Sequence, residues 1–263
     1  MARAIYGGLL DSGFSATNLF VVDPSAAAQD NARQAGIEHV FDSAPGEVLS
    51  ADLIVLAIKP QITKAALQPL AGRLGTNSLV LSIVAGISAE SLASLLGLSN
   101  TGHIIRCMPN TPALVGEGMT GLYACREAGS DAGKALAERV MSSVGQCVWV
   151  ENESDLDVIT AISGSGPAYF FLFIESLTDA AIALGMNSES ARKLALQTAL
   201  GASRLASLSS EDAATLRKNV TSPGGTTEQA IQAFEAADIR SIVAQATQAA
   251  ARRSVELSKE FRA

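Results

Sequence analysis

The first half of the chain alternates short apolar runs with longer amphipathic stretches. Apolar runs of this length predict strands buried on both faces of a parallel sheet, and the stretches between them have helical spacing. Strands are predicted at Leu19–Val22, Ile37–Phe41, Leu53–Ile58, Leu79–Val84, His103–Met108, Gly121–Ala124 and Val148–Val150. Helices are predicted at Met1–Ser12, Ser25–Ala35, Gln61–Leu70, Ser88–Leu96 and Asp131–Val144. Strands separated by single helices indicate right-handed crossovers and a doubly wound parallel α/β sheet, with Gly121–Ala124 at an edge.

The pattern changes near residue 151, after which no strand is predicted. The helices expected there are Pro167–Leu184, Ser188–Leu208, Glu211–Val220, Thr226–Ala237 and Ile239–Phe261. Several are apolar on more than one face. A core within the chain is one explanation, but a part this small has little interior, so burial against a second copy is favoured. The sequence therefore predicts an α/β domain at 1–151, an all-helical domain at 152–263, and a homodimer.

Composition narrows the class of protein. With 263 residues, 48% of them hydrophobic and 17% charged, the chain can bury a core without disulfide or metal staples. A net charge of -7 argues against nonspecific nucleic-acid binding. The apolar runs Leu53–Ile58 and Ala168–Ile174 are shorter than the roughly 18–20 residues of a membrane span, and the N-terminus is unlike a signal peptide. We therefore expect a cytoplasmic protein that binds neither nucleic acid nor membranes.

The cysteines and histidines offer little catalytic machinery. The three cysteines are odd in number and form no CxxC pair, so neither a disulfide framework nor a metal site is expected. His39 and His103 each lie beside a predicted strand without a neighbouring acid or serine motif, and a structural role is expected for both.

Unusual residues follow several predicted strands. Asp23 ends one strand, residues 57–60 (AIKP) end a second, residues 83–86 (IVAG) a third and residues 108–112 (MPNTP) a fourth. Ligands of doubly wound sheets bind beyond the carboxyl ends of the strands, and small residues there let a flat ligand approach. One such end could be an ordinary strand-to-helix turn. Their repetition favours a binding crevice.

Two glycine- and serine-containing segments lie in the helical half, at residues 162–169 (ISGSGPAY) and 220–228 (VTSPGGTTE). We interpret both as loops that place free backbone N–H groups at the start of a helix, which suits a carboxylate or phosphate. Either could be a plain helix–helix connection. Two of them in one helical domain favour a site for a small anion.

The strings AIKPQ, RCMPNTPA, ISGSGPAYFF and LRKNVTSPGGTTEQAI, in this order and spacing, resemble the pyrroline-5-carboxylate reductase family over essentially the whole chain. The resemblance implies reduction of 1-pyrroline-5-carboxylate to L-proline, the last step of proline biosynthesis, with hydride from NADPH or NADH and no metal. It also implies a Rossmann domain followed by a helical domain that dimerises by interleaving helices, with dimers often assembled into rings.

The resemblance also implies roles for individual residues. Those that would bind the cofactor are Met1, Asp23, Ala57, Ile58, Lys59, Pro60, Ile83, Ala85 and Asn219. Those that would bind the substrate are Ser165, Gly166, Ser222, Gly225, Thr226 and Thr227. Thr227 is the catalytic candidate, because its hydroxyl can orient the ring nitrogen or relay a proton from water. An imine accepts hydride readily once its nitrogen is protonated, so the protein mainly has to align two rings.

The chain departs from the family pattern at its start. The family begins with a strand and a Gly-x-Gly-x-x loop, whereas Met1 and Ala2 match residues just beyond that loop. The first strand is therefore expected to be missing from its place between Leu19–Val22 and Leu53–Ile58, as in a truncated or mis-started sequence.

Three questions stay open at the level of sequence. A noncatalytic helical assembly module with a crippled nucleotide domain is one alternative to the reductase. A β-hydroxyacid dehydrogenase is another, opposed by the absence of Lys and His from Pro167–Leu184. For the cofactor, Asp23 favours NADH because a carboxylate there repels a 2′-phosphate, whereas the resemblance favours NADPH. We predict that a chain with its N-terminus restored uses both, with weakened discrimination in favour of NADPH.

Overall fold

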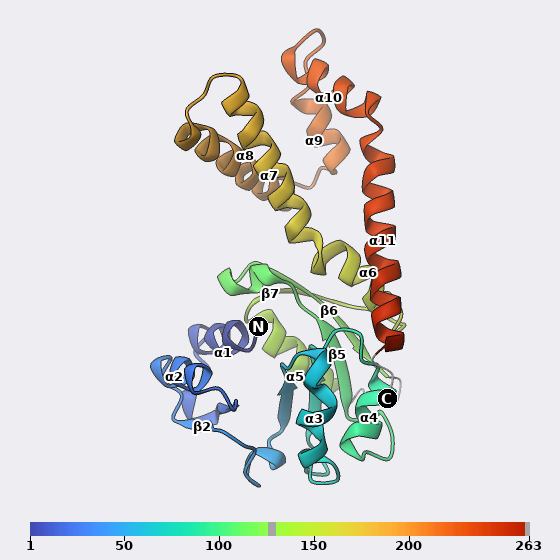
Figure 1. Ribbon diagram of the computed structural model, residues 1–263. Helices are drawn as coiled ribbons and strands as arrows, with labels where there is room; N and C mark the ends of the chain where they lie inside the picture. The colour runs from blue at the N-terminus through green and yellow to red at the C-terminus, as the bar shows by residue number, and fades with distance from the viewer. Residues whose placement is uncertain (126–129, 261–263) are drawn as a thin grey trace. The chain divides into compact units, whose positions relative to one another are not determined.

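A computed structural model gives the fold and describes residues 1–125 and 130–260 (Figure 1). The strands are β1 Phe20–Val22, β2 His39–Phe41, β3 Leu53–Leu56, β4 Leu79–Ser82, β5 Ile104–Met108, β6 Gly118–Ala124 and β7 Gly145–Trp149. The helices are α1 Ala2–Asp11, α2 Ala26–Gln34, α3 Thr63–Leu67, α4 Ala89–Leu96, α5 Asp131–Ser142, α6 Asp155–Ile159, α7 Gly166–Ala183, α8 Ser188–Leu208, α9 Ala213–Asn219, α10 Thr226–Ala236 and α11 Ile239–Glu260. Phe261, the predicted end of the last helix, lies outside the described residues.

The chain divides into two compact units that are not continuous in sequence. The first contains Met1–Ser165 and the segment that begins at Ala250, and the second contains Gly166–Ala249. Helix α6 and the end of α11 therefore belong to the α/β unit, beyond the expected boundary at residue 151. A hydrogen bond of 2.5 Å from the Ser254 hydroxyl to the Asp157 carboxylate joins these two helices. The first unit is Rossmann-like and the second is all-helical, in agreement with the predicted fold class.

The strands form two separate sheets. β1 pairs with β2, in parallel, while β3, β4, β5, β6 and β7 form a second sheet in that order. Among the described strands, none pairs with the free edge of β3 or with the free edge of β1. These edges belong to the two strands between which the first strand of the family was expected to be missing.

The prediction of a fully parallel sheet is wrong at the pairing of β5 with β6. β3, β4 and β5 are parallel, but β6 runs antiparallel to β5 and parallel to β7. The connection from β5 to β6 holds only the short 3-10 helix Thr111–Val115 and no crossover helix, so the chain simply reverses. β6 lies between two partners, and the expectation that it forms an edge is also wrong.

Both faces of the larger sheet are buried. In β4, Leu81 packs into a cluster that includes Leu9 of α1 and Met141 of α5. Its neighbour Val80 belongs to a second cluster, which includes Leu92 of α4. Successive side chains of a strand point to opposite faces, so these two clusters are the two sides of a doubly wound layer arrangement.

Helix α1 lies very close to the connection between α5 and β7. A Cβ atom added to Gly8 would stand 2.5 Å from the Ser143 carbonyl oxygen and 2.6 Å from the Cγ1 atom of Val144. The neighbouring Gly7 has open space at the same position. Gly8 is therefore what allows α1 to pack against this part of the sheet.

The helical unit exposes much apolar surface. α7 and α8 pack on each other, and the chain turns between them at Gly185, whose φ is 96°. On α7, Phe170 and Phe171 are each 64% exposed, and Leu200 of α8 is 60% exposed. By length and composition alone, the helical run Asp155–Ala183 could cross a membrane. The uninterrupted apolar run within it, Ala168–Ile174, is shorter than a membrane span. Apolar surface on this scale is typical of helices that pack against another protein chain.

Candidate active site

Two neighbouring strand ends carry the central cofactor candidates. Residues 57–60 follow β3, and Ile83 and Ala85 follow β4. Because β3 and β4 are adjacent and parallel, both segments lie at the same edge of the sheet. Ala57, Ile58, Pro60, Ile83 and Ala85 are half-buried, and Lys59 is exposed. The structure thus brings these residues together as the sequence predicted.

The segment after β4 is a tight turn. Gly86 has a φ of 76°, in the left-handed region that favours glycine. Ser88 then caps α4, because its hydroxyl oxygen accepts the Ser91 amide at 3.1 Å. This short path leaves Ala85 close to the sheet edge instead of extending into solvent.

Asp23 lies on the other sheet, directly after β1. Its Oδ1 atom accepts the Ser25 amide at 2.8 Å, and its carbonyl accepts the Gln29 side-chain amide at 2.8 Å. The carboxylate therefore shapes the turn into α2. Beside it, the ring of Phe20 stacks on that of His39 with centroids 4.6 Å apart, which gives this histidine a packing role.

The start of α1 suits an anion. Met1 precedes the helix, and no side chain caps its first turn. Arg3 adds a positive charge in that turn. Helix starts of this kind bind the pyrophosphate of dinucleotides, and the small residues after β3 and β4 admit a flat ring. The residues present therefore fit a nicotinamide dinucleotide.

The first glycine- and serine-containing segment is not a loop, so the interpretation made from sequence is wrong. Residues Thr160–Gly164 form a π-helical turn that continues α6, and Ser165 separates this turn from the start of α7. The Ser165 amide donates to the Thr160 carbonyl at 2.8 Å, and Gly166 is buried at the start of α7. The amide of Ser165 is therefore already used, and π-turns of this kind are frequent at functional sites.

Asn110 holds this π-turn in place, a role that sequence reasoning missed. Its Nδ2 atom donates to the Ser163 carbonyl at 3.0 Å, and its Oδ1 atom accepts the Met119 amide at 2.9 Å. The residue is 9% exposed. Its position just beyond a buried strand, after Pro109, was the available signal, because a polar side chain there has few partners other than backbone groups.

The second segment is the turn that opens α10. Gly225 is the N-cap residue of α10 and donates its amide to the Ser222 carbonyl at 3.0 Å. Gly224, with a φ of 72°, donates its amide to the Glu228 carboxylate at 2.8 Å. Glu228 thus uses one amide that the sequence suggested was free. Its spacing of three residues from the N-cap was a recognisable signal.

The first turn of α10 keeps donors for a ligand. Helix geometry leaves the amides of Thr226 and Thr227 without intrahelical acceptors, and no side chain caps them. Thr227 is half-buried and Thr226 is exposed. At the end of α9, the Asn219 side chain donates to the Glu211 carboxylate at 2.9 Å.

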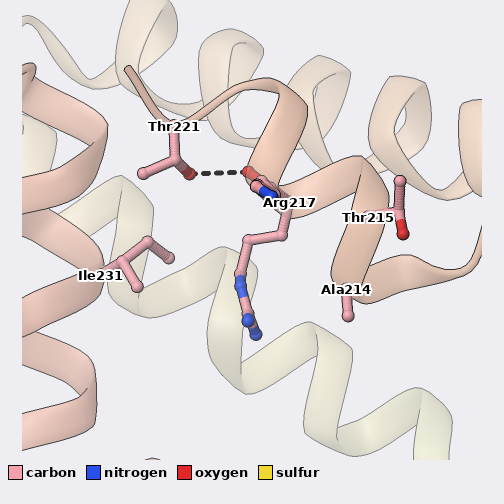
Figure 2. Close-up of a pocket in the computed structure, with 6 residues that line it drawn as sticks. Ala214, Thr215, Arg217, Thr221 and Ile231 are labelled. Atoms are coloured by element: carbon pink, nitrogen blue, oxygen red, sulfur yellow. Dashed lines mark hydrogen bonds between the residues drawn. The ribbon is translucent and has the colours of Figure 1, made fainter. Parts of the chain in front are cut away.

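A pocket of about 470 Å³ lies between α9 and α10 (Figure 2). In it, the Thr221 hydroxyl donates to the Arg217 carbonyl at 2.6 Å, and Ile231 of α10 forms the facing wall. Its lining residues are Ala214, Thr215, Arg217, Lys218, Thr221 and Ile231. The positive charges of Arg217 and Lys218 favour an anionic ligand in this pocket.

No group of three or more His, Cys, Asp or Glu side chains suited to a metal occurs in residues 1–125 and 130–260.

Comparison with known proteins places these features in one family. A family profile described as pyrroline-5-carboxylate reductase dimerisation matches residues 153–257, and one described as NADP oxidoreductase coenzyme F420-dependent matches residues 1–86. A Pseudomonas aeruginosa protein named pyrroline-5-carboxylate reductase is 44% identical over 263 residues, covering 99% of this chain and 94% of that protein.

Solved structures agree. That of a pyrroline-5-carboxylate reductase from Coxiella burnetii is 39% identical with a TM-score of 0.91, covering 97% of this chain and 94% of that one. That of the Plasmodium falciparum pyrroline carboxylate reductase with NADP bound is 31% identical with a TM-score of 0.82, covering 97% and 93%.

Proposed function

This chain belongs to the pyrroline-5-carboxylate reductase family, and we propose that it reduces 1-pyrroline-5-carboxylate to L-proline with hydride from NADPH or NADH. This is the last step of proline biosynthesis. The observation that carries the proposal is the turn before α10, which retains two amides and the Thr227 hydroxyl for a small anionic ring. A noncatalytic assembly module would have no use for these two amides and this hydroxyl.

The substrate groups are assigned to this turn. The carboxylate of the pyrroline is bound by the amides of Thr226 and Thr227, with Ser222 and Gly225 shaping the turn around it. The Thr227 hydroxyl holds the ring nitrogen and orients its proton. Ser165 and Gly166 remain proposed as substrate-binding residues, through the shape of the π-turn and not through free amides.

The cofactor is assigned to the strand ends. The segments after β3 and β4, including Ala57–Pro60, Ile83 and Ala85, form the surface for its ring, and the first turn of α1 beside Met1 takes its phosphates. Asp23 is assigned to the ribose and Asn219 to the cofactor from the helical unit. When bound, the dihydronicotinamide supplies a hydride to the imine carbon of the substrate. The protein's own part is alignment of the two rings and exclusion of water.

The helical unit is assigned to assembly. The family profile for dimerisation covers residues 153–257, from α6 to most of α11, and exposed apolar side chains lie along α7, α8 and α11. We propose a homodimer through these helices, with rings of dimers as a higher state. On this basis the functional division is 1–151 for the cofactor and 152–263 for substrate and assembly. The free thiols of Cys107, Cys125 and Cys147 support a cytoplasmic location.

The deciding experiment is an assay with 1-pyrroline-5-carboxylate and NADPH or NADH, followed at the absorbance of the reduced nicotinamide. We expect oxidation of the cofactor only when the pyrroline is present, with L-proline as product. A parallel reaction with a β-hydroxyacid and NADP should give no reduction. An intact dimer that neither binds nor reduces the pyrroline would instead support the assembly module. Light scattering on the same sample measures the oligomeric state.

A further inference from the structure

Glu153 connects three separate segments of the α/β unit. Its Oε1 atom accepts the Ala89 amide at 2.7 Å, at the first residue of α4. The same atom accepts the Arg106 Nη1 donor of β5 at 2.9 Å. Glu153 itself lies between β7 and α6. One carboxylate oxygen therefore ties the start of α4 to the sheet.

The pair is largely withdrawn from water. The side chain of Arg106 is 12% exposed and that of Glu153 is 30% exposed. The Nε atom of Arg106 is buried and has no acceptor among the described residues, and Glu153 is the carboxylate with which this guanidinium pairs. A charge held in such surroundings depends strongly on its partner, because water does not replace a lost carboxylate.

The neighbouring side chains leave these two as the charged members of the cluster. Tyr123 lies directly opposite Arg106 in the β5–β6 register. Its hydroxyl hydrogen-bonds with the Cys125 thiol at 3.5 Å, and this bond together with burial raises the pKa of Tyr123 to about 12. The tyrosine is therefore neutral under ordinary conditions. The Glu153–Arg106 pair holds the carboxylate that accepts the Ala89 amide at the start of α4.

The start of α4 is where the turn from β4 ends. Residues 83–88 link β4 to α4, and they contain Ile83 and Ala85, the proposed cofactor residues. Ser88 caps the helix locally through Ser91, whereas Glu153 ties its first amide to another part of the fold. The position of Ala85 is thus fixed at one end by the sheet and at the other end by Glu153.

We propose that Glu153, backed by Arg106, is a positioning residue that holds the β4–α4 turn in the shape that accepts the nicotinamide cofactor. This inference rests on the proposed function, because it takes Ile83 and Ala85 as cofactor contacts. Glu153 is assigned no contact with substrate or cofactor. Its effect is expected in cofactor binding and not in the hydride step.

The test measures the dissociation constant of NADPH by fluorescence, together with kcat and both KM values, in the full chain. Glu153→Ala is expected to weaken NADPH binding about 3- to 30-fold, with the KM for pyrroline-5-carboxylate and kcat changing less than about 2-fold. Glu153→Gln keeps an acceptor for the Ala89 amide and should give a smaller effect. Glu151→Ala, an exposed glutamate two residues earlier, is the matched control and should match the unsubstituted protein.

Unchanged NADPH binding in Glu153→Ala would overturn the inference. A fall in kcat together with similar rises in the KM for NADPH and the KM for pyrroline-5-carboxylate would also overturn it, because that result indicates general destabilisation. If Glu153→Ala does not fold, Glu153→Gln and Arg106→Gln are measured in its place. Selective weakening of NADPH binding in both variants supports the inference, and unchanged NADPH binding in both overturns it. Failure of the proposed function looks different, because the unsubstituted protein would then not reduce the pyrroline at all.

Discussion

Thr227 is the residue on which the proposed chemistry depends most. Its hydroxyl is assigned to the ring nitrogen, whose charge changes during reduction. A hydrogen bond to a charged group contributes about 1.5–3 kcal/mol, so Thr227→Val should lower kcat/KM by roughly 10- to 150-fold. Thr247→Val removes a hydroxyl that bonds only within α11, and steady-state kinetics should be nearly unchanged there. Full turnover by Thr227→Val would remove the residue from the mechanism.

Asp23 is expected to set the choice between NADH and NADPH. We propose that its carboxylate lies at the ribose, where it would repel a 2′-phosphate, although one oxygen already accepts the Ser25 amide. Asp23→Ser keeps a hydroxyl for that amide and removes the charge, so the ratio of kcat/KM for NADPH to that for NADH should rise by about 3- to 30-fold. Asp30→Ser on α2 removes an exposed charge elsewhere on the same unit and serves as the control. A ratio unchanged in Asp23→Ser would place the ribose elsewhere.

Single residues also show what sequence reasoning can place. Ala57, Ile58, Ile83 and Ala85 follow apolar runs, and parallel neighbouring strands bring such positions to one edge of the sheet, whereas their role at the cofactor stays a prediction. The roles of Asn110 and Glu153 could not be found in this way. Their partners are backbone groups that lie far away in sequence, and no local pattern specifies that kind of contact.

At the scale of elements, α1 gives a matched pair of glycines. Gly8→Ala places a Cβ 2.5 Å from the Ser143 carbonyl oxygen and should destabilise the α/β unit by about 1–3 kcal/mol, because the helix has to shift. Gly7→Ala meets no atom within 4 Å and should stabilise it by about 0.5–1 kcal/mol, because alanine favours a helix interior. Urea unfolding of both variants measures the difference. Equal effects would mean that α1 does not pack closely against Ser143.

The π-turn offers a second test at this scale. Asn110→Ala leaves the Ser163 carbonyl and the Met119 amide unpaired in a buried place, at about 1–3 kcal/mol for each group. We expect a loss of stability of about 2–5 kcal/mol in chemical unfolding. Asn100→Ala removes one side-chain bond in an exposed turn, and its cost should stay below about 1 kcal/mol. A small effect at Asn110 would show that water replaces its bonds.

The elements themselves were largely predictable, with two instructive exceptions. Helices such as α8 begin and end where the apolar spacing indicated. The direction of β6 was missed because a Pro- and Gly-containing connection reverses the chain without any local sign in the strand itself. The π-turn was read as a loop because Gly and Ser usually break helices. Here the buried contacts with Asn110 outweigh that preference.

At the scale of the whole molecule, the free edge of β3 has a measurable signature. The carbonyls of Asp52 and Leu56 accept the amides of Leu79 and Ile83 of the β4 side. Alternation along a strand then turns the amides of Leu53 and Val55 toward the edge at which no described strand pairs. A free strand edge also weakens the cooperative unit around it.

We therefore expect hydrogen exchange of the 263-residue polypeptide, resolved by residue, to label Val55 faster than Ile54. β4, which is paired on both sides, serves as the internal reference within the same sheet. The long helix α11 should be strongly protected in the dimer. Equal, strong protection of Val55 and Ile54 would mean that another segment covers this edge.

The division of the chain also determines when the α/β unit can be finished during synthesis. Its last piece begins at Ala250, after the whole of the helical unit, and Ser254 is the residue that bonds Asp157. Ribosomes add about 5–20 residues per second, so the emerging sheet waits on the order of 4–17 s for this piece. During that time the surface of α6 that α11 covers stays open to chaperones. A premature stop codon near Ala250 would consequently leave the α/β unit, most of which is synthesised first, without its last helical segment.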